Sequence, residues 1–312
     1  ILEVRNEALE THYINQLHLL EVRHEEHQAV LPTHDGQLVA VDSQVRPIRA
    51  TDTSGQDITG VLHDADGEAW QASDARLAEL SPDDLYDHID LEFDGLPAGT
   101  NQALTLRFRN SLLNTVLFYD IMLKGLGFEA LDWMSRATPT LKMMQAGRRY
   151  QKQMGMRVSV LEGSRYREVA HIPDQGPIAW KEVAVPLSTT AKQVKVRLSF
   201  VSDNWRLDSA TAGTMQYAKG RSIALTSVTA GDVRRDDSLK SLAASDSNYL
   251  ITKPGDRLQV RFDVDQTPSA RTFFLDAEGY YVEWMRNEWL TAGTNDPVKP
   301  GSREGLWRAM QN

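Results

Sequence analysis

The chain has 312 residues, of which 34 are basic and 43 acidic, and its formal net charge is −9. This acidic balance argues against a nucleic-acid-binding protein, and the hydrophobic fraction of 41% is that of a globular chain. Because the sequence holds no cysteine, it excludes disulfides, thiolate metal centres and cysteine nucleophiles. No apolar stretch reaches the ~18 residues that a membrane-spanning helix needs. The chain opens on Ile1-Leu2-Glu3-Val4, without an initiator Met or a signal-peptide pattern, which suits a mature product or part of a longer protein.

Strand signals dominate the first 93 residues. Alternating apolar and polar residues predict strands within 1–24 and again at 89–93. Asp35-Gly36 separates two short apolar runs and predicts a hairpin. Residues 42–90 are otherwise polar and rich in turns, and Ser81-Pro82 predicts a single helical turn.

Two apolar segments follow. Residues 104–109 alternate strictly, so they predict a half-buried strand whose outer face carries Arg107 and Arg109. Residues 112–123 are nearly all apolar and are compatible with a buried strand or a buried helix. The β-branched and aromatic residues at 116–119 favour a strand for the second half of this segment.

Residues 126–154 differ in kind, because their apolar side chains recur at helical spacing. We expect one or two helices here, interrupted near Pro139 and ended by Gly155. Met143 and Met144 lie on the apolar side, and methionine-rich faces adapt well to a partner surface. The alternative is that this face packs locally across an open sheet.

The strand pattern returns after residue 155. Clean alternation occurs at 156–160, 194–200 and 258–264. Residues 209–247 are rich in Ser, Ala, Asp and Gly, and they predict a long connection or flap with one strand near 223–228. The C-terminal 291–312 predicts a turn-rich tail with a helix around 304–310.

These elements predict a mainly antiparallel β protein made of β-sandwich domains, of the jelly-roll or immunoglobulin-like type, with a helical insert. The expected division is a first sandwich at 1–125, the insert at 126–155, a second sandwich at 156–290 and the tail at 291–312. Strand pairing between the two halves would instead make one interleaved domain.

Aromatic and basic side chains gather near the C-terminus and suit a binding surface. They are Tyr280, Tyr281, Trp284, Arg286 and Trp289. Such residues anchor protein interfaces and sugar-stacking platforms. On a strand, Tyr280 and Trp284 point one way and Tyr281 the other, so both faces carry an aromatic. Packing inside the end of a sandwich is the alternative interpretation.

The nearest pattern to a metal site is Asp64-Ala65-Asp66-Gly67-Glu68, whose carboxylates resemble the start of a calcium loop. A full loop needs a bidentate acid at its twelfth position, where this chain has Ala75. An Asp-Gly turn is therefore preferred, and Asp64, Asp66 and Glu68 stay weak candidates. No nucleophile elbow or phosphate-binding loop occurs, so we predict no catalytic residue and no cofactor.

Several segments together resemble a known kind of region. These are the opening Ile1-Leu2-Glu3-Val4-Arg5-Asn6-Glu7, the stretch Trp180-Lys181-Glu182-Val183, the block Lys253-Pro254-Gly255-Asp256, and Arg271-Thr272-Phe273-Phe274-Leu275. They resemble a β-rich region of large exported bacterial proteins that also carry FG-GAP or ASPIC/UnbV segments. The FG-GAP calcium loops and the ASPIC segment themselves do not occur here. The resemblance implies a non-catalytic module in the periplasm or outside the cell.

The leading functional hypothesis is therefore a non-catalytic extracytoplasmic binding or structural module. It would be an accessory subunit that stabilises a larger envelope or membrane-associated protein assembly. A carbohydrate-binding module that stacks sugars on the C-terminal aromatics is the first alternative. A glycan-active hydrolase with acids from separate strands is the second.

Overall fold

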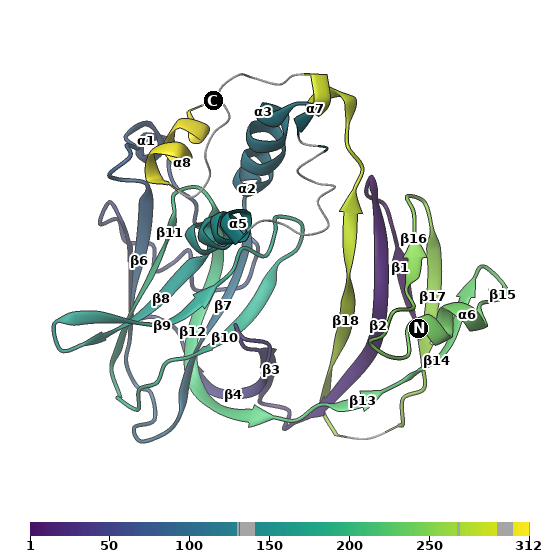
Figure 1. The fold of residues 1–312 in the computed structure, drawn as a ribbon. Coiled ribbons are helices and arrows are strands. Elements are labelled where there is room, and N and C mark those ends of the chain that lie inside the picture. The colour runs from purple at the N-terminus through teal and green to yellow at the C-terminus, as the bar shows by residue number, and fades with distance from the viewer. Residues whose placement is uncertain (130, 132–140, 267–268, 292–301, 312) are drawn as a thin grey trace. The chain divides into compact units, whose positions relative to one another are not determined.

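The computed structural model describes residues 1–129, 131, 141–266, 269–291 and 302–311, with side chains for all of these except 141–144 and 146. The chain forms two compact units (Figure 1). Unit 1 comprises Ile1–Val30 and Ala218–Met285, and unit 2 comprises Leu31–Tyr217 and Arg286–Asn312. Each unit joins segments that are distant in the sequence. This arrangement replaces the expected consecutive sandwiches at 1–125 and 156–290, because strands from both halves pair within unit 2.

Unit 2 is built around two five-stranded sheets. The first has the order β10 (Lys181–Pro186), β7 (Gln102–Asn110), β12 (Trp205–Ala218), β4 (Leu38–Val45) and β3 (Ala29–Pro32). The second has the order β5 (Arg49–Asp52), β6 (Tyr86–Phe93), β11 (Val194–Val201), β8 (Met156–Glu162) and β9 (Arg165–Ile172). The mainly β class and the hairpin at Asp35-Gly36, now β3 and β4, are thus confirmed.

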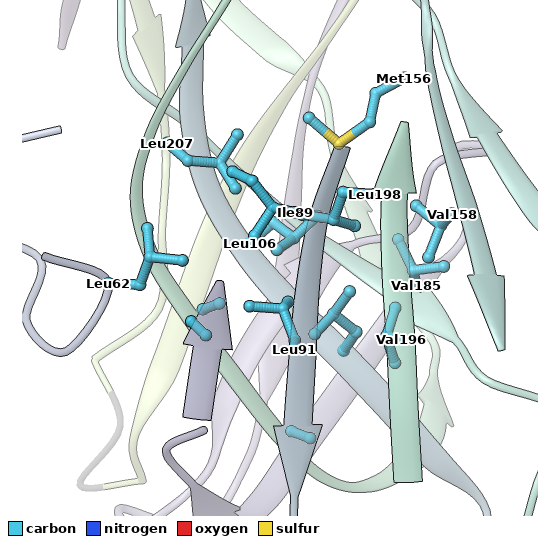
Figure 2. Packing of buried hydrophobic residues seen from close by; sticks show 14 of the residues in the cluster. Leu62, Ile89, Leu91, Leu106, Met156, Val158, Val185, Val196, Leu198 and Leu207 are labelled. Carbon is cyan, nitrogen blue, oxygen red and sulfur yellow. The ribbon is translucent and has the colours of Figure 1, made fainter. Parts of the chain in front are cut away.

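The core of unit 2 lies between these sheets, as strand alternation requires. Strand β6 alternates half-buried and buried residues along its whole length. Its Ile89 and Leu91 pack with Leu106 of β7 and Leu198 of β11 (Figure 2). Burying one such side chain stabilises the fold by about 1.5–3 kcal/mol, so this cluster is the main driving force for folding of unit 2.

Unit 2 also contains helical segments. They are α1 (Asp74–Ala78), α2 (Leu113–Val116), the π-helical η1 (Leu117–Leu123), α3 (Lys124–Leu126), α5 (Leu141–Met154), α7 (Asn287–Thr291) and α8 (Arg303–Met310). The helix expected within 126–155 is confirmed as α5, and it ends before Gly155 as expected. The C-terminal helix is confirmed as α8, whereas Pro139 lies outside the described residues.

Two local expectations were wrong. Residues 113–126 are helical, and no strand forms at 116–119. The reason is one-sided packing, since Leu117 is buried against Met154 of α5 and Leu306 of α8, and Leu123 is also buried, while Val116 is exposed. Ser81-Pro82 forms a tight turn rather than a helical one, and the nearby helix α1 begins after Ser73, whose hydroxyl accepts from the Arg76 amide.

Unit 1 is a smaller two-sheet structure. One sheet has the order β1 (Leu2–Arg5), β17 (Arg257–Phe262), β14 (Leu225–Ala230) and β15 (Val233–Arg234). The other is built on β2 (Glu10–Arg23), which pairs with β13 (Arg221–Ile223), β16 (Leu250–Thr252) and β18 (Arg271–Glu283). Its core joins both sheets and the helix α6 (Asp236–Ser241), through residues such as Leu17, Leu242 and Val260.

The expectation of one long connection at 209–247 was also wrong. Residues 209–218 continue β12, and Ala210 and Ala212 are buried in the core of unit 2. Small residues are needed there because a Cβ on Gly213 would collide with the Asp42 carbonyl of the neighbouring strand. A composition rich in Ala, Ser and Gly therefore reflects close strand packing in this segment.

Candidate functional site

The longest edge strand of unit 1 is β18. It pairs with β2 along its whole length, from Arg271 opposite Arg23 to Glu283 opposite Glu10 (Figure 1). Strands β13 and β16 pair with parts of β2 that are already paired with β18, so they occupy its opposite edge. Within the described residues, no strand pairs with the second edge of β18. An unpaired edge offers a row of free backbone donors and acceptors.

Apolar side chains are exposed on both faces of this strand. We call the following residues the β18 surface: Phe273, Leu275, Tyr280, Tyr281, Val282 and Trp284. Tyr281 is 58% exposed and Val282, which points the opposite way, is 48% exposed. A strand at the end of a sandwich normally hides one face, so exposure on both faces marks β18 as unusual. The neighbouring residues Tyr280 and Tyr281 are both exposed.

Neighbouring side chains hold the aromatic rings of the β18 surface in place. Tyr280 stacks on Tyr13 of β2, and Tyr249 meets both rings edge to face. The indole nitrogen of Trp284 donates to the Thr11 hydroxyl at 2.9 Å. Sequence reasoning missed Tyr13 and Tyr249, although Tyr13 opens the alternating stretch of β2 that the sequence did reveal.

A buried carboxylate ties β18 to its neighbours at the opposite end. Glu21 of β2 pairs with Arg221 of β13 at 2.7 Å and with Arg271 of β18 at 3.1 Å. Burial by itself raises the pKa of Glu21, but the hydrogen bonds from Arg221 and Arg271 outweigh burial, so this pKa lies below its usual value. Glu21 thus fixes β13 and β18 on either side of β2.

The other two candidates near the C-terminus, Arg286 and Trp289, belong to unit 2. Trp289 on α7 is only 5% exposed, and it stacks on Tyr119 with ring centroids 5.0 Å apart. The Arg286 guanidinium lies over the same indole. Trp289 therefore packs as a core residue, and its expected role as an exposed binding residue is corrected. Arg286 acts in this structure as its packing partner.

Met143 and Met144 lie on helix α5. Their side chains are outside the described residues, so the expected methionine-rich face stays a prediction. Other residues of α5 do have a packing role, since Met154 is fully buried in the cluster that also holds Leu117 and Leu306.

The weak metal candidates lie in the loop between β5 and β6. Asp64 pairs with Arg46 at 2.6 Å and with His63 at 2.8 Å. The hydrogen bond from His63 and the charge of Arg46 hold the pKa of Asp64 below its usual value. Asp66 accepts from the Glu68 amide, which is the expected turn. Within the ranges described above, no three ligand-type side chains gather in a metal-binding arrangement.

Several carboxyl groups have shifted pKa values. In the described part of the chain, the shifted pKa values are those of Glu3, Glu21, Asp35, Asp57, Asp64, Asp84, Asp90, Asp94 and Glu162, and each lies below its usual value. The shifts arise from arginine, histidine and hydroxyl or amide hydrogen bonds. A glycosidase general acid needs a raised pKa, so none of these nine groups suits that role.

The comparisons with known proteins add little to this geometry. No family model and no curated protein matches the sequence. One similar solved structure is that of TmCBM61 in complex with beta-1,4-galactotriose, at 11% identity and a TM-score of 0.22, covering 47% of this chain and 80% of that chain. In the described residues, no helix is long and apolar enough to span a bilayer.

Proposed function

We propose that this chain is a non-catalytic binding module that holds a partner protein on the β18 surface, as an accessory part of a larger extracytoplasmic assembly. One observation carries the proposal: a long edge strand exposes apolar side chains on both faces, and no strand among the described residues pairs with its second edge. Exposed apolar patches of this kind mark interaction sites in soluble proteins.

The partner element that fits best is an extended segment that adds a strand to the free edge of β18. Backbone hydrogen bonds would supply affinity, and side chains on alternate faces would supply specificity. The edge also carries the exposed acids Asp276 and Glu278. An apolar segment with basic residues would therefore complement β18 in both character and charge.

The test is partner capture with matched variants of the full chain. Val282→Lys places a charge on the β18 surface, whereas Val233→Lys places one on β15, an exposed position in the other sheet of unit 1. Lysine on an edge strand opposes strand addition. Wild type and Val233→Lys should each co-purify, in fixed stoichiometry, with the same proteins from membrane and soluble fractions of the source cells.

Val282→Lys should lose these proteins while keeping the wild-type melting temperature. The proposal fails if Val282→Lys retains the same partners, or if the wild-type chain is recovered alone. The extracytoplasmic location is inferred from the family resemblance, and fractionation of the source cells tests it separately.

Carbohydrate binding is the second candidate, because Tyr280 and Trp284 both expose aromatic surface. It ranks lower because Tyr280 already stacks on Tyr13 and the Trp284 indole N–H is already bonded. A glycan array with the wild type and Tyr280→Ala decides between protein binding and carbohydrate binding. If sugars stack on Tyr280, the wild type gives a signal that the variant loses.

A further inference from the structure

A second surface with unusual chemistry lies in unit 2, on the outer face of the sheet that contains β7. Strand β7 directs Leu106 and Phe108 into the core, so Arg107 and Arg109 point outward. Arg206 of β12 is directly opposite Arg109 in the strand register. On the other side, β10 pairs Lys181 with Phe108, which brings the preceding Trp180 beside Arg109.

Trp180 organises the two outward arginines of β7. The guanidinium carbons of Arg107 and Arg109 lie 4.9 and 4.8 Å from the centroid of its indole ring. Cation–π contacts of this kind hold a guanidinium in a defined orientation. Trp180 is itself half-buried.

Arg107, Arg109 and Arg206 differ in how their charges are paired with carboxylates. Arg107 pairs with the buried Asp208 and lies 3.5 Å from Glu182, and Arg206 pairs with Asp203 at 2.7 Å. In the described part of the chain, no carboxylate pairs with Arg109, which is exposed.

Two arginines directly opposite each other on neighbouring strands repel, and only Arg206 has its own acid. An anion bound at Arg109 would relieve this repulsion.

Asp208 makes the surface rigid. A register shift between Leu207 and Ser209 places Asp208 at a bulge of β12, where its side chain is fully buried. One oxygen accepts from the Gly67 amide at 2.7 Å, and the other pairs with Arg107. Arg107 is therefore fixed, and it holds one side of Trp180 in place.

We propose that Arg109 and Trp180 form a binding site for an acidic sugar, with a uronic acid as the unit recognised. The carboxylate would accept two hydrogen bonds from the guanidinium fork of Arg109. The C–H face of the pyranose ring would pack against the Trp180 side chain. A uronic acid carries a charge and an apolar face on one rigid ring, whereas an aspartate or glutamate side chain offers little apolar area.

Calorimetric titration of the full chain tests the proposal. The probes are hexagalacturonate, a neutral hexasaccharide of galactose and a glutamate hexapeptide. Arg109→Gln removes the charge, Arg109→Lys keeps the charge without the fork, and Arg165→Gln is the control at an exposed position on β9 of the same unit. Thermal melting confirms that each variant is folded.

We expect hexagalacturonate to bind the wild type and Arg165→Gln equally and more weakly at high salt. Arg109→Gln should bind at least about tenfold more weakly, with Arg109→Lys between the two. Three results would each overturn the proposal: no binding of hexagalacturonate at millimolar concentration, equal binding by Arg109→Gln, or equal binding of the glutamate peptide, which would indicate a site for acidic proteins instead.

Discussion

Tyr280 of β18 and Tyr13 of β2 stand directly opposite each other and stack in parallel, with ring centroids 4.7 Å apart and an interplanar angle of 8°. The pair lies beside a register shift, where Gly279 faces Ile14 and Asn15 is the extra residue of β2. Aromatic pairs contribute about 0.5–1.5 kcal/mol beyond their burial. This stack therefore helps to hold β18, an otherwise exposed strand, against β2.

Gly279→Ala should detach part of β18. A Cβ at this position would collide with the backbone carbonyl of Tyr13, which cannot move without disturbing the strand pair. Overpacking of this kind costs about 1–3 kcal/mol. Hydrogen exchange should rise within 271–283 and stay unchanged in unit 2. The control is Gly60→Ala, where a Cβ meets nothing within 4 Å, and equal exchange in both variants would contradict the prediction.

Leu106→Ala should destabilise unit 2 selectively. Leu106 is fully buried between the two sheets, and truncating such a leucine costs about 2–5 kcal/mol. Because unit 1 has its own core, its amides should keep their protection from hydrogen exchange. Val260→Ala should give the reverse pattern. Equal loss of protection in both units after either substitution would show that the two cores unfold together.

Asp208→Asn should be costly although it changes one atom. The amide oxygen can still accept from Gly67, but the charge that faces Arg107 is lost. Breaking a fully buried pair costs about 3–5 kcal/mol, and we expect about 2–3 kcal/mol here because Arg107 keeps some contact with solvent. Urea unfolding measures the difference. Asp263→Asn removes an exposed partner of Arg261 and should change stability by less than about 0.5 kcal/mol.

His88 should make unit 2 less stable as the pH falls. Burial, together with the Arg197 guanidinium, holds the pKa of His88 below its usual 6.5, although the carboxylates of Asp90, Asp87 and Asp52 oppose the shift. Since the unfolded chain then binds the proton more readily, the contribution of His88 is complete above pH 6.5 and declines below it. The urea midpoint should fall as the pH is lowered just below 6.5, and it should fall less steeply for His88→Gln than for the wild type. The same slope in both proteins would refute this prediction.

Calcium should have no effect on the loop that holds Asp64 and Asp66. Both carboxylates already have protein partners, Arg46 and His63 for the first and the Glu68 amide for the second. The melting temperature should therefore be the same in millimolar Ca²⁺ as in EDTA. A rise in melting temperature that Asp64→Asn abolishes would restore the calcium interpretation.

Much of the secondary structure follows from local pattern. Strict alternation at 194–200 and 258–262 corresponds to β11 and β17, because a residue's face in a strand depends only on its parity. The strand predicted at 116–119 was wrong because a nearly all-apolar segment such as 112–123 carries no periodicity. There the burial of Leu117 and Leu123 in the folded protein decided between strand and helix.

The candidate surfaces were only partly visible in the sequence. Tyr280, Tyr281 and Trp284 were recognised because they are close together in the chain. Tyr13 and Tyr249 were missed because they reach the same place through strand pairing over a long sequence separation. Trp289 was misjudged for the related reason that its burial depends on Tyr119, far upstream in the chain.

The sequence by itself determined the mainly β class, the faces of the strands, the helix that ends before Gly155, and the absence of cysteine chemistry. Each of these depends on neighbouring residues or on composition. The tertiary structure alone decided which strands pair, and hence that each unit combines distant segments of the chain, that Trp289 is buried, and that Trp180 lies beside Arg109. Strand pairing joins backbone groups that every residue shares, so its long-range choices depend on how the whole set of apolar faces can be buried together.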